Sequence, residues 1–216
     1  MEETLEGYQR PYDAHRPMVC FDEGTKQLVK DVRAPLPVAP GHPERMDYAY
    51  ERNGTGNLCM MCEPLAGRRE VLVTERRTAV DSAEAIQHLV DVCSPKAEHI
   101  VLVQDNLTTH TLASLYEAFP PEDARRLIDK LEVHSTPKHG SWLNMAEIAR
   151  GVVRRQCLDR RIPDCSTLTG EVAVWQSDRH AAQGKVDWQF TTADARVKLK
   201  RLYPILEPVK TKWTDH

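Results

Sequence analysis

Two short apolar segments of the chain end abruptly at a carboxylate. Met18-Val19-Cys20-Phe21 is followed by Asp22, and Ile100-Val101-Leu102-Val103-Gln104 is followed by Asp105. Apolar runs of this length and type are typical of buried strands. Ligand sites in open α/β sheets lie beyond the carboxyl ends of the strands. Asp105 is therefore predicted to occupy a position suited to chemistry, and Asp22 ends a strand in the same way.

The first half of the chain is predicted to form an antiparallel meander of strands. Residues 69–76 alternate polar and apolar side chains, as a half-exposed strand does, and Ala66-Gly67 would make the turn before them. The Pro-rich segment 34–43 cannot be regular structure, because proline removes backbone donors, and we expect a loop or a rigid arm. The other predicted elements are a strand over 25–32 that pairs with the first, strands over 48–52 and 58–64, and a turn at Asn53-Gly54-Thr55-Gly56.

The second half alternates helices and strands. Apolar residues recur at helical spacing over 81–92, with Asp81 or Ser82 as the expected cap. A third acid, Glu147, lies at the start of a helix predicted over 144–159. Further helices are predicted over 111–119, 122–130, 166–183 and 192–203, with a strand over 131–135 and a loop over 137–141. This order predicts a mixed α/β fold, in which a helix crossing the sheet would bring the three distant acids together.

Composition and charge limit the classes of function. The chain has 216 residues, which suits one domain, and is 41% hydrophobic and 28% charged. A net charge of −3 argues against a simple nucleic-acid-binding module, which is usually basic, but allows an enzyme that holds metal ions through carboxylates. No apolar stretch approaches membrane-spanning length, and the acidic N-terminus lacks the features of a signal peptide. We therefore expect a cytoplasmic protein with no membrane partner.

The six cysteines are scattered, and most lie in apolar runs, where cysteine behaves as a small hydrophobic residue. Only Cys59 and Cys62 form a tight pair. A zinc site usually draws on two such pairs, and no second pair exists in this sequence. We therefore expect a buried strand here, in a reducing compartment.

The motifs around the acids resemble those of a known family. Asp22, Val103-Gln104-Asp105-Asn106-x-x-x-His110 and Ser141-Trp142-Leu143-Asn144-x-x-Glu147 are similar to the DDE transposases of the mariner-related bacterial insertion sequences. The resemblance covers nearly the whole chain. It implies an RNase H-like fold: a mixed five-stranded sheet whose first three strands are antiparallel, with helices on both faces. Asp22 would lie on the first strand, Asp105 on the fourth, and Glu147 on the helix after the fifth.

The resemblance also implies a chemistry. Asp22, Asp105 and Glu147 would be catalytic and would hold two Mg²⁺ ions, with Asp22 between them and Mn²⁺ as a substitute. Carboxylates suit Mg²⁺ because it is a hard cation that takes oxygen ligands. Two such ions favour in-line displacement at phosphorus. Water would then cleave DNA, and the freed 3′-hydroxyl would attack target DNA.

Several neighbouring residues are candidates for support or for DNA binding. Asn106, His110 and Asn144 would support the site, although Asn106 also suits a turn and His110 a helix start. Two clusters of cationic residues would follow a phosphate backbone, although each also suits a solvated helix face. The first comprises Arg150, Arg154, Arg155, Arg160 and Arg161, and the second comprises Lys198, Lys200 and Arg201 beside Arg196.

The sequence departs from the family in two ways. No helix-turn-helix region precedes the first strand, so we expect residues 1–16 to be a lead-in segment, 17–207 the catalytic domain and 208–216 a polar tail. A separate helix-turn-helix region or second reading-frame product would then bind the element ends, and the active complex would be a homodimer on DNA in the bacterial nucleoid. Second, Ala149-Arg150-Gly151 is unusual after the catalytic acid, and a mid-helix glycine costs about 1 kcal/mol relative to alanine.

Three other functions compete with a transposase. A metal-dependent nuclease of the same fold would use the same three acids and would not join DNA ends. An inactive remnant would keep the fold without activity. A haloacid-dehalogenase-like phosphatase is suggested by Phe21-Asp22-Glu23-Gly24-Thr25, but that chemistry requires an aspartate where Gly24 stands.

Overall fold

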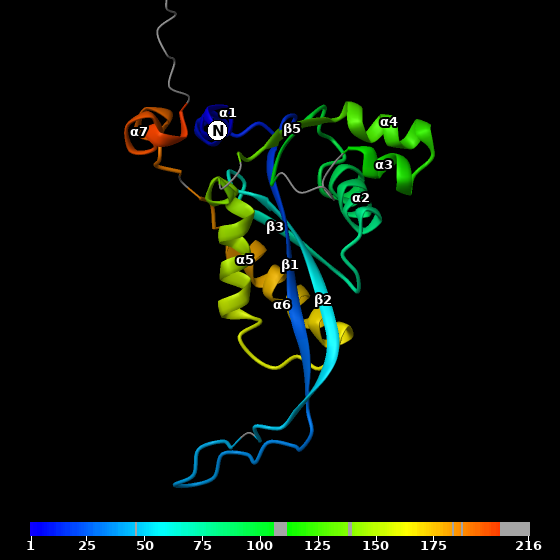
Figure 1. Ribbon diagram of the computed structural model, residues 1–216, viewed down its shortest axis with the longest axis vertical. Helices are drawn as coiled ribbons and strands as arrows, with labels where there is room; N and C mark the ends of the chain where they lie inside the picture. The colour runs from blue at the N-terminus through cyan, green and yellow to red at the C-terminus, as the bar shows by residue number, and fades with distance from the viewer. Residues whose placement is uncertain (46, 106–111, 138–139, 183, 187, 204–216) are drawn as a thin grey trace, which may run out of the picture.

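The computed structural model describes residues 1–45, 47–105, 112–137, 140–182, 184–186 and 188–203. Its centre is a five-stranded sheet with the strand order β3-β2-β1-β4-β5 (Figure 1). The strands are β1 (Met18–Asp31), β2 (Tyr50–Glu63), β3 (Arg68–Thr74), β4 (Ile100–Gln104) and β5 (Leu131–Ser135). β1, β2 and β3 pair antiparallel, whereas β4 runs parallel to both β1 and β5. The predicted fold class is thus confirmed.

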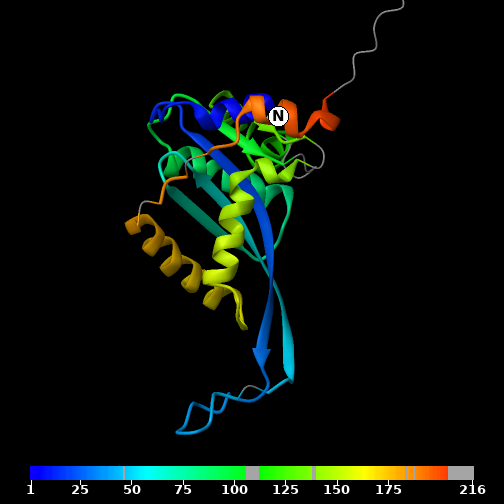
Figure 2. The ribbon, with the colours of Figure 1, turned by 90° about the vertical axis from the view of Figure 1, so that its left-hand side faces the viewer.

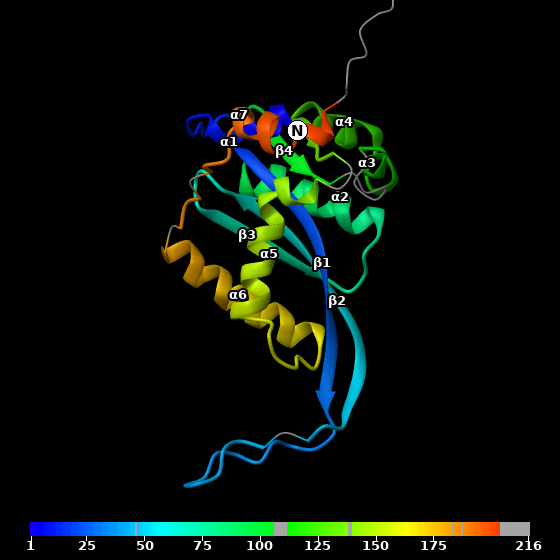
Figure 3. The same ribbon diagram turned by 60° about the vertical axis from the view of Figure 1, so that its left-hand side comes forward.

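Helices cover both faces of the sheet (Figures 2 and 3). On one face, α5 (Met145–Gln156) and α6 (Cys165–Ala182) pack on strand residues such as Cys20, Met60 and Cys62. On the other face lie α2 (Ala79–His88), a π-helical turn (Leu89–Cys93), α3 (Ala113–Ala118) and α4 (Pro121–Asp129), against residues such as Phe21 and Met61. Successive strand residues point to opposite faces, so each long strand supplies both cores. None of the helices in the described part of the chain is both long and apolar enough to cross a membrane.

Two long strands replace four predicted short ones. The segment 25–32 was wrongly predicted as a separate strand, because β1 continues through it as far as Asp31. β2 (Tyr50–Glu63) covers most of the predicted strands 48–52 and 58–64 and joins them. The predicted turn at 53–56 is therefore wrong. Gly54, with a φ of 86°, lies at an irregularity in the pairing of β2 with Gln27 and Val29 of β1. Gly56 leaves room for Leu168 of α6, because a Cβ there would approach the Leu168 side chain to 2.5 Å.

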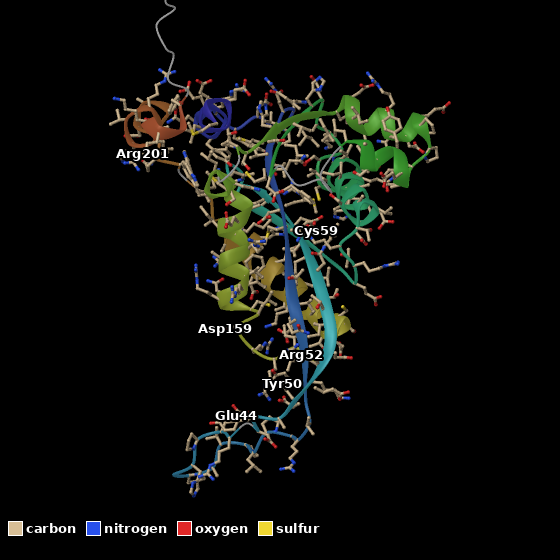
Figure 4. All side chains as sticks on the ribbon, in the orientation of Figure 1. Glu44, Tyr50, Arg52, Cys59, Asp159 and Arg201 are labelled. Carbon is tan, nitrogen blue, oxygen red and sulfur yellow. The ribbon has the colours of Figure 1, made fainter. Side chains whose placement is uncertain are left out.

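The Pro-rich segment projects from the body as an arm. The described residues of the arm 32–49, which are 32–45 and 47–49, extend beyond the ends of β1 and β2, with Glu44 on the arm and Tyr50 where β2 begins (Figure 4). Isolated bridges join Leu36 to Arg45 and Ala39 to His42. Val38 is 74% exposed and Tyr48 is 94% exposed. The prediction of a loop or rigid arm is confirmed, and the arm presents apolar side chains to solvent.

Helix positions follow the predictions, with corrections at their ends. Residues 1–16, which were predicted to be a lead-in segment, contain the helix α1 (Glu2–Gln9). Its Leu5 and Tyr8 are buried. The N-terminal cap of α2 is Thr78, so the predicted caps Asp81 and Ser82 are wrong. The Thr78 hydroxyl accepts from the Asp81 amide, and the Asp81 side chain accepts from the Thr78 amide in return. A 3-10 turn at Ser141–Leu143 precedes α5, and α7 (Thr192–Lys198) is followed by a second 3-10 turn at Lys200–Leu202.

Candidate active site

The sheet brings two of the three predicted acids side by side. β1 and β4 are parallel, and Phe21 pairs with Gln104. The next residue along β1 is Asp22, and the next residue after β4 is Asp105. Asp22 is 6% exposed, and one carboxylate oxygen of Asp105 is also buried. Strand pairing therefore creates the acidic edge that the two apolar runs predicted.

The third acid is delivered by α5. Glu147 lies in the first turn of this helix, which packs on the face of the sheet that carries Asp22. Asn144 fixes the start of the helix: its side-chain oxygen accepts from the Ala146 amide at 3.1 Å, and its Nδ2 donates to the Phe21 carbonyl at 2.7 Å. The same asparagine thus caps α5 and joins it to β1, one residue before Asp22.

The three acids interact electrostatically. The pKa of Asp22 is raised to about 6, mainly by burial, and the charges of Asp105 and Glu147 contribute to this rise. Arg150 and the Glu23 amide, which donates to Asp22 Oδ1 at 2.8 Å, act against this rise. The three carboxylates do not converge on a single point, since within the described residues only Glu70, His88 and Cys93 form a group of three potential ligands within 4.8 Å of one another.

Arg150 is part of this acidic site. Its Nε lies 3.3 Å from Asp22 Oδ2, and its Nη1 donates to the Glu23 carbonyl at 2.5 Å. A Cβ on Gly24 would approach the Arg150 Cδ to 2.5 Å, so this glycine makes room for the guanidinium. We predicted Arg150 as a DNA contact and missed this ion pair, although Arg150 lies three residues after Glu147 and hence on the same side of the helix.

The other residues of the first cationic cluster differ in their surroundings. Arg154 and Arg155 are exposed on α5. Arg160 pairs with Glu171, and Arg161 pairs with Asp31 and lies 5.6 Å from the Tyr50 ring centre. A groove beside the acids is lined by Glu147, Arg150 and Arg154 of α5 and by Lys26 and Gln27 of β1, among others. Arg154 and Lys26 therefore face the same groove as Glu147.

The second cationic cluster lies on α7 and on the 3-10 turn that follows it. Figure 4 places Arg201 beside α7, and Asp159 near the lower end of α5. Lys198 lies 5.5 Å from the Phe190 ring centre, and Arg196 makes two hydrogen bonds of 2.8 Å to Glu2. Lys200 and Arg201 are exposed. The predicted support residues Asn106 and His110 lie outside the described residues.

The cysteine pair behaves as a buried strand. Cys59 and Cys62 are 0% and 1% exposed, and they belong to the cores on opposite faces of the sheet. Two side chains that point to opposite faces cannot share one ion, so the structure agrees with the expectation of a buried strand.

The donor set of the acidic site fits hard divalent cations. It consists of carboxylates, the ligands that Mg²⁺ and Mn²⁺ accept, and buried Asp22 Oδ2 has no hydrogen-bond partner among the described residues. A cation would relieve the repulsion that raises the Asp22 pKa. A two-ion centre also needs no single point of convergence, because its ions lie about 3.5–4 Å apart.

Comparison with family models identifies the class of protein. The model described as "DDE superfamily endonuclease" matches residues 17–169, and the chain belongs to this family. The chain is thus an enzyme of the DDE type, and Asp22, Asp105 and Glu147 lie within the matched region. No protein with a curated description matches this sequence.

Solved structures of the Mos1 mariner transposase share the fold. The paired-end complex with Mn aligns with a TM-score of 0.53 at 19% identity, over 82% of this chain and 52% of that one. The Mos1 strand transfer complex aligns with a TM-score of 0.54 at 19% identity, over 82% of this chain and 51% of that one. The chain therefore spans about half the length of these structures. At this identity the likeness establishes the RNase H-like fold.

Proposed function

We propose that this chain is the catalytic domain of a DNA transposase, which cleaves DNA phosphodiesters and joins the freed 3′-hydroxyl to target DNA. The observation that carries the proposal is the pairing of Phe21 with Gln104, which makes Asp22 and Asp105 neighbours beneath Glu147 in a DDE-family fold. In this proposal the catalytic domain spans residues 17–207.

Each acid has a separate part in holding the metal ions. Asp22, which is buried and interacts electrostatically with both other acids, would contact both ions, and Asp105 and Glu147 would each complete one of them. When bound, two Mg²⁺ or Mn²⁺ ions stabilise the attacking and leaving oxygens of an in-line displacement. The chain itself supplies the fixed positions: β1 and β4 hold the aspartates, and Asn144 holds the helix of Glu147.

The groove beside Glu147 is the proposed path of the DNA. Arg154 and Lys26 line it, and Arg155 is exposed on the same helix, so these cations would contact phosphates and fix the position of the DNA without reading its sequence. Arg160 and Arg161 already pair with acids of this chain and are weaker candidates. Lys198, Lys200 and Arg201 would contact DNA beyond the acidic site.

The proposed partners follow from the same comparison. The Mos1 structures are described as paired-end and strand transfer complexes, which supports a homodimer on DNA for this chain. The exposed apolar side chains of the arm 32–49 suit contact with a second copy. A separate helix-turn-helix region would recognise the element ends, and the complex would act in the cytoplasm at the bacterial nucleoid.

Cleavage of labelled duplex DNA with candidate element ends tests the proposal, in Mg²⁺ or Mn²⁺. We expect Asp22→Ala, Asp105→Ala and Glu147→Ala each to lower cleavage at least about a hundredfold, because each removes several kcal/mol of charge stabilisation. Asp178→Ala, at an exposed acid of α6, is the matched control.

The products separate the candidate functions. Joined DNA ends identify a transposase, whereas nicking alone identifies a nuclease of the same fold. Cleavage that survives the three substitutions would place the site elsewhere. No cleavage, even with a helix-turn-helix region supplied in trans, would mean an inactive remnant.

A further inference from the structure

A second group of potential metal ligands lies away from the acidic site. Glu70 of β3, His88 at the end of α2 and Cys93 of the π-helical turn place one ligand atom each within 4.8 Å of the others. Glu70 pairs with Met61, which pairs with Phe21, so Glu70 points to the same face as these two residues. Asp22, the next residue on β1, points to the opposite face. The two sites are thus separated by the sheet.

The π-helical turn is what brings His88 and Cys93 together. In a regular α-helix, residues five apart would project about 140° from each other. Here the Ser94 amide donates to the Leu89 carbonyl at 2.9 Å, an i→i+5 bond that widens the turn. Residues five apart then project closer to the same direction than they would in an α-helix. Single π-turns in helices are frequent at functional sites.

Glu70 is held in place by a neighbouring side chain. Gln176 of α6 donates from Nε2 to Glu70 Oε2 at 2.8 Å, and its Oε1 accepts from the Val71 amide at 2.8 Å. The other carboxylate oxygen, Oε1, lies 3.4 Å from His88 Nε2. Metal ligands are commonly oriented by such hydrogen bonds from outside the coordination sphere.

The distances and access suit a tetrahedral ion. Ligand bonds of about 2.0–2.1 Å to oxygen and nitrogen place these atoms about 3.3–3.4 Å apart at tetrahedral angles. The side chains of Glu70 and His88 are 29% and 27% exposed, and Cys93 is half-buried. A pocket lined by Glu70 and Cys93 opens beside the group and leaves room for a water ligand.

We propose that Glu70, His88 and Cys93 form a zinc site that fastens edge strand β3 to the end of α2. Thiolate and imidazole ligands favour Zn²⁺ over Mg²⁺, so the site would be selective against the ion expected at Asp22. On binding, the Cys93 thiol loses its proton to solvent and its sulfur bonds to zinc. One thiolate, one carboxylate and neutral imidazole balance the two charges of Zn²⁺.

Cobalt binding to the reduced, metal-free intact chain tests this site. In excess Mg²⁺ we expect one equivalent of Co²⁺ to give thiolate-to-metal charge-transfer absorption and tetrahedral visible bands, which one equivalent of Zn²⁺ removes. Cys93→Ser should abolish the charge-transfer absorption. Cys165→Ser, at another half-buried cysteine, should retain it and is the matched control.

Variants at the other ligands and at the acidic site sharpen the test. His88→Gln should lower zinc affinity at least roughly tenfold, and Gln176→Ala should lower it about 10–100-fold by freeing Glu70. Asp22→Ala should leave zinc binding unchanged. If circular dichroism shows that Cys93→Ser does not fold, the zinc affinity of His88→Gln tests the proposal instead. Failure of the wild-type chain to give the charge-transfer absorption, or its persistence in Cys93→Ser, would overturn the proposal.

Discussion

At the scale of single residues, the positive charge of Arg150 partly offsets the burial and the neighbouring negative charges that disfavour ionised Asp22. Asp22 is buried beside two other acids, which disfavours its charged form, and Arg150 supplies the cation that favours it. A guanidinium in this position partly replaces the charge that a metal ion would bring. The sequence showed Arg150 only as one of several arginines after Glu147. The pairing depends on Gly24, whose missing side chain leaves space for the arginine.

Removing the buried charge at Asp22 should stabilise the metal-free protein at neutral pH. The pKa of Asp22 is raised from 3.8 to about 6, so folding binds a proton and wild-type stability falls as the pH rises from about 4 to 6. In EDTA, Asp22→Asn should therefore be more stable than wild type at pH 7.5, by up to about 3 kcal/mol. The difference should vanish near pH 4. Urea unfolding across this pH range measures it.

The control for this prediction is Asp178→Asn, which alters an exposed acid on α6. It should not reproduce the gain in stability at pH 7.5, because it removes no buried charge. An Asp22→Asn protein that is less stable than wild type at pH 7.5 would contradict the electrostatic account.

Replacing Arg150 should strengthen metal binding at the acids. Arg150→Gln removes the positive charge of a guanidinium whose Nε lies 3.3 Å from Asp22 Oδ2. Because Mg²⁺ would then no longer compete with the guanidinium for Asp22, we expect the variant to bind Mg²⁺ roughly tenfold more tightly. Calorimetric titration with Mg²⁺ measures the change. Arg155→Gln, at an exposed arginine of the same helix, should bind Mg²⁺ as wild type does. Equal affinity in both variants would mean that Arg150 does not compete with the ion.

At the scale of elements, Asn144 sets the position of Glu147 relative to Asp22. The residue is 2% exposed and joins the start of α5 to the end of the apolar part of β1. The sequence motif Leu143-Asn144-x-x-Glu147 marked both residues, and the predicted helix start at 144 agrees with the cap. The bond to Phe21 could not be predicted, because it joins residues 123 positions apart.

Asn144→Ala should lower both stability and cleavage. It removes a cap and leaves the buried Phe21 carbonyl without its donor, at a cost of about 1–3 kcal/mol. Asn144→Ser keeps a capping oxygen and should recover part of the stability without recovering cleavage, because serine does not reach Phe21. Chemical unfolding and the DNA cleavage assay measure the two effects.

The matched control is Thr191→Ala, which removes the cap of α7. It should cost about 1 kcal/mol and leave cleavage unchanged. If Asn144→Ser cleaved DNA as wild type does, the bond to Phe21 would have no part in positioning Glu147.

At the scale of the whole molecule, the arm stands apart from the body. Its exposed Val38 and Tyr48 contribute nothing to the two cores, so they do not stabilise the fold of a single chain. The structure therefore separates a catalytic body from a projecting hairpin extension (Figure 2). We propose that a second copy covers this extension.

Replacing residues 33–48 by a short glycine-containing turn should leave the melting temperature within a few degrees of wild type, because few buried contacts are lost. Self-association on DNA should decrease, as measured by analytical ultracentrifugation. A control with Arg33→Ala alone should associate as wild type does, since it retains the apolar side chains. Unchanged association after removal of the arm would exclude it as the contact between copies.

The sequence alone determined the kind of elements and singled out three acids as candidates, because apolar runs, caps and motif spacing are local signals. It identified β4, β5 and the start of α5 nearly to the residue. It failed at 25–32, which continues the first strand, and at 53–56, where Gly54 and Gly56 indicate a turn in isolation. In the fold, Gly54 lies at an irregularity in the pairing with β1, and Gly56 leaves room for Leu168 of α6. Only tertiary structure decided which acids are neighbours, where Arg150 points, and that Glu70, His88 and Cys93 meet. These outcomes depend on strand register and on side chains from distant segments, and pairing across a sheet leaves no mark in the local sequence.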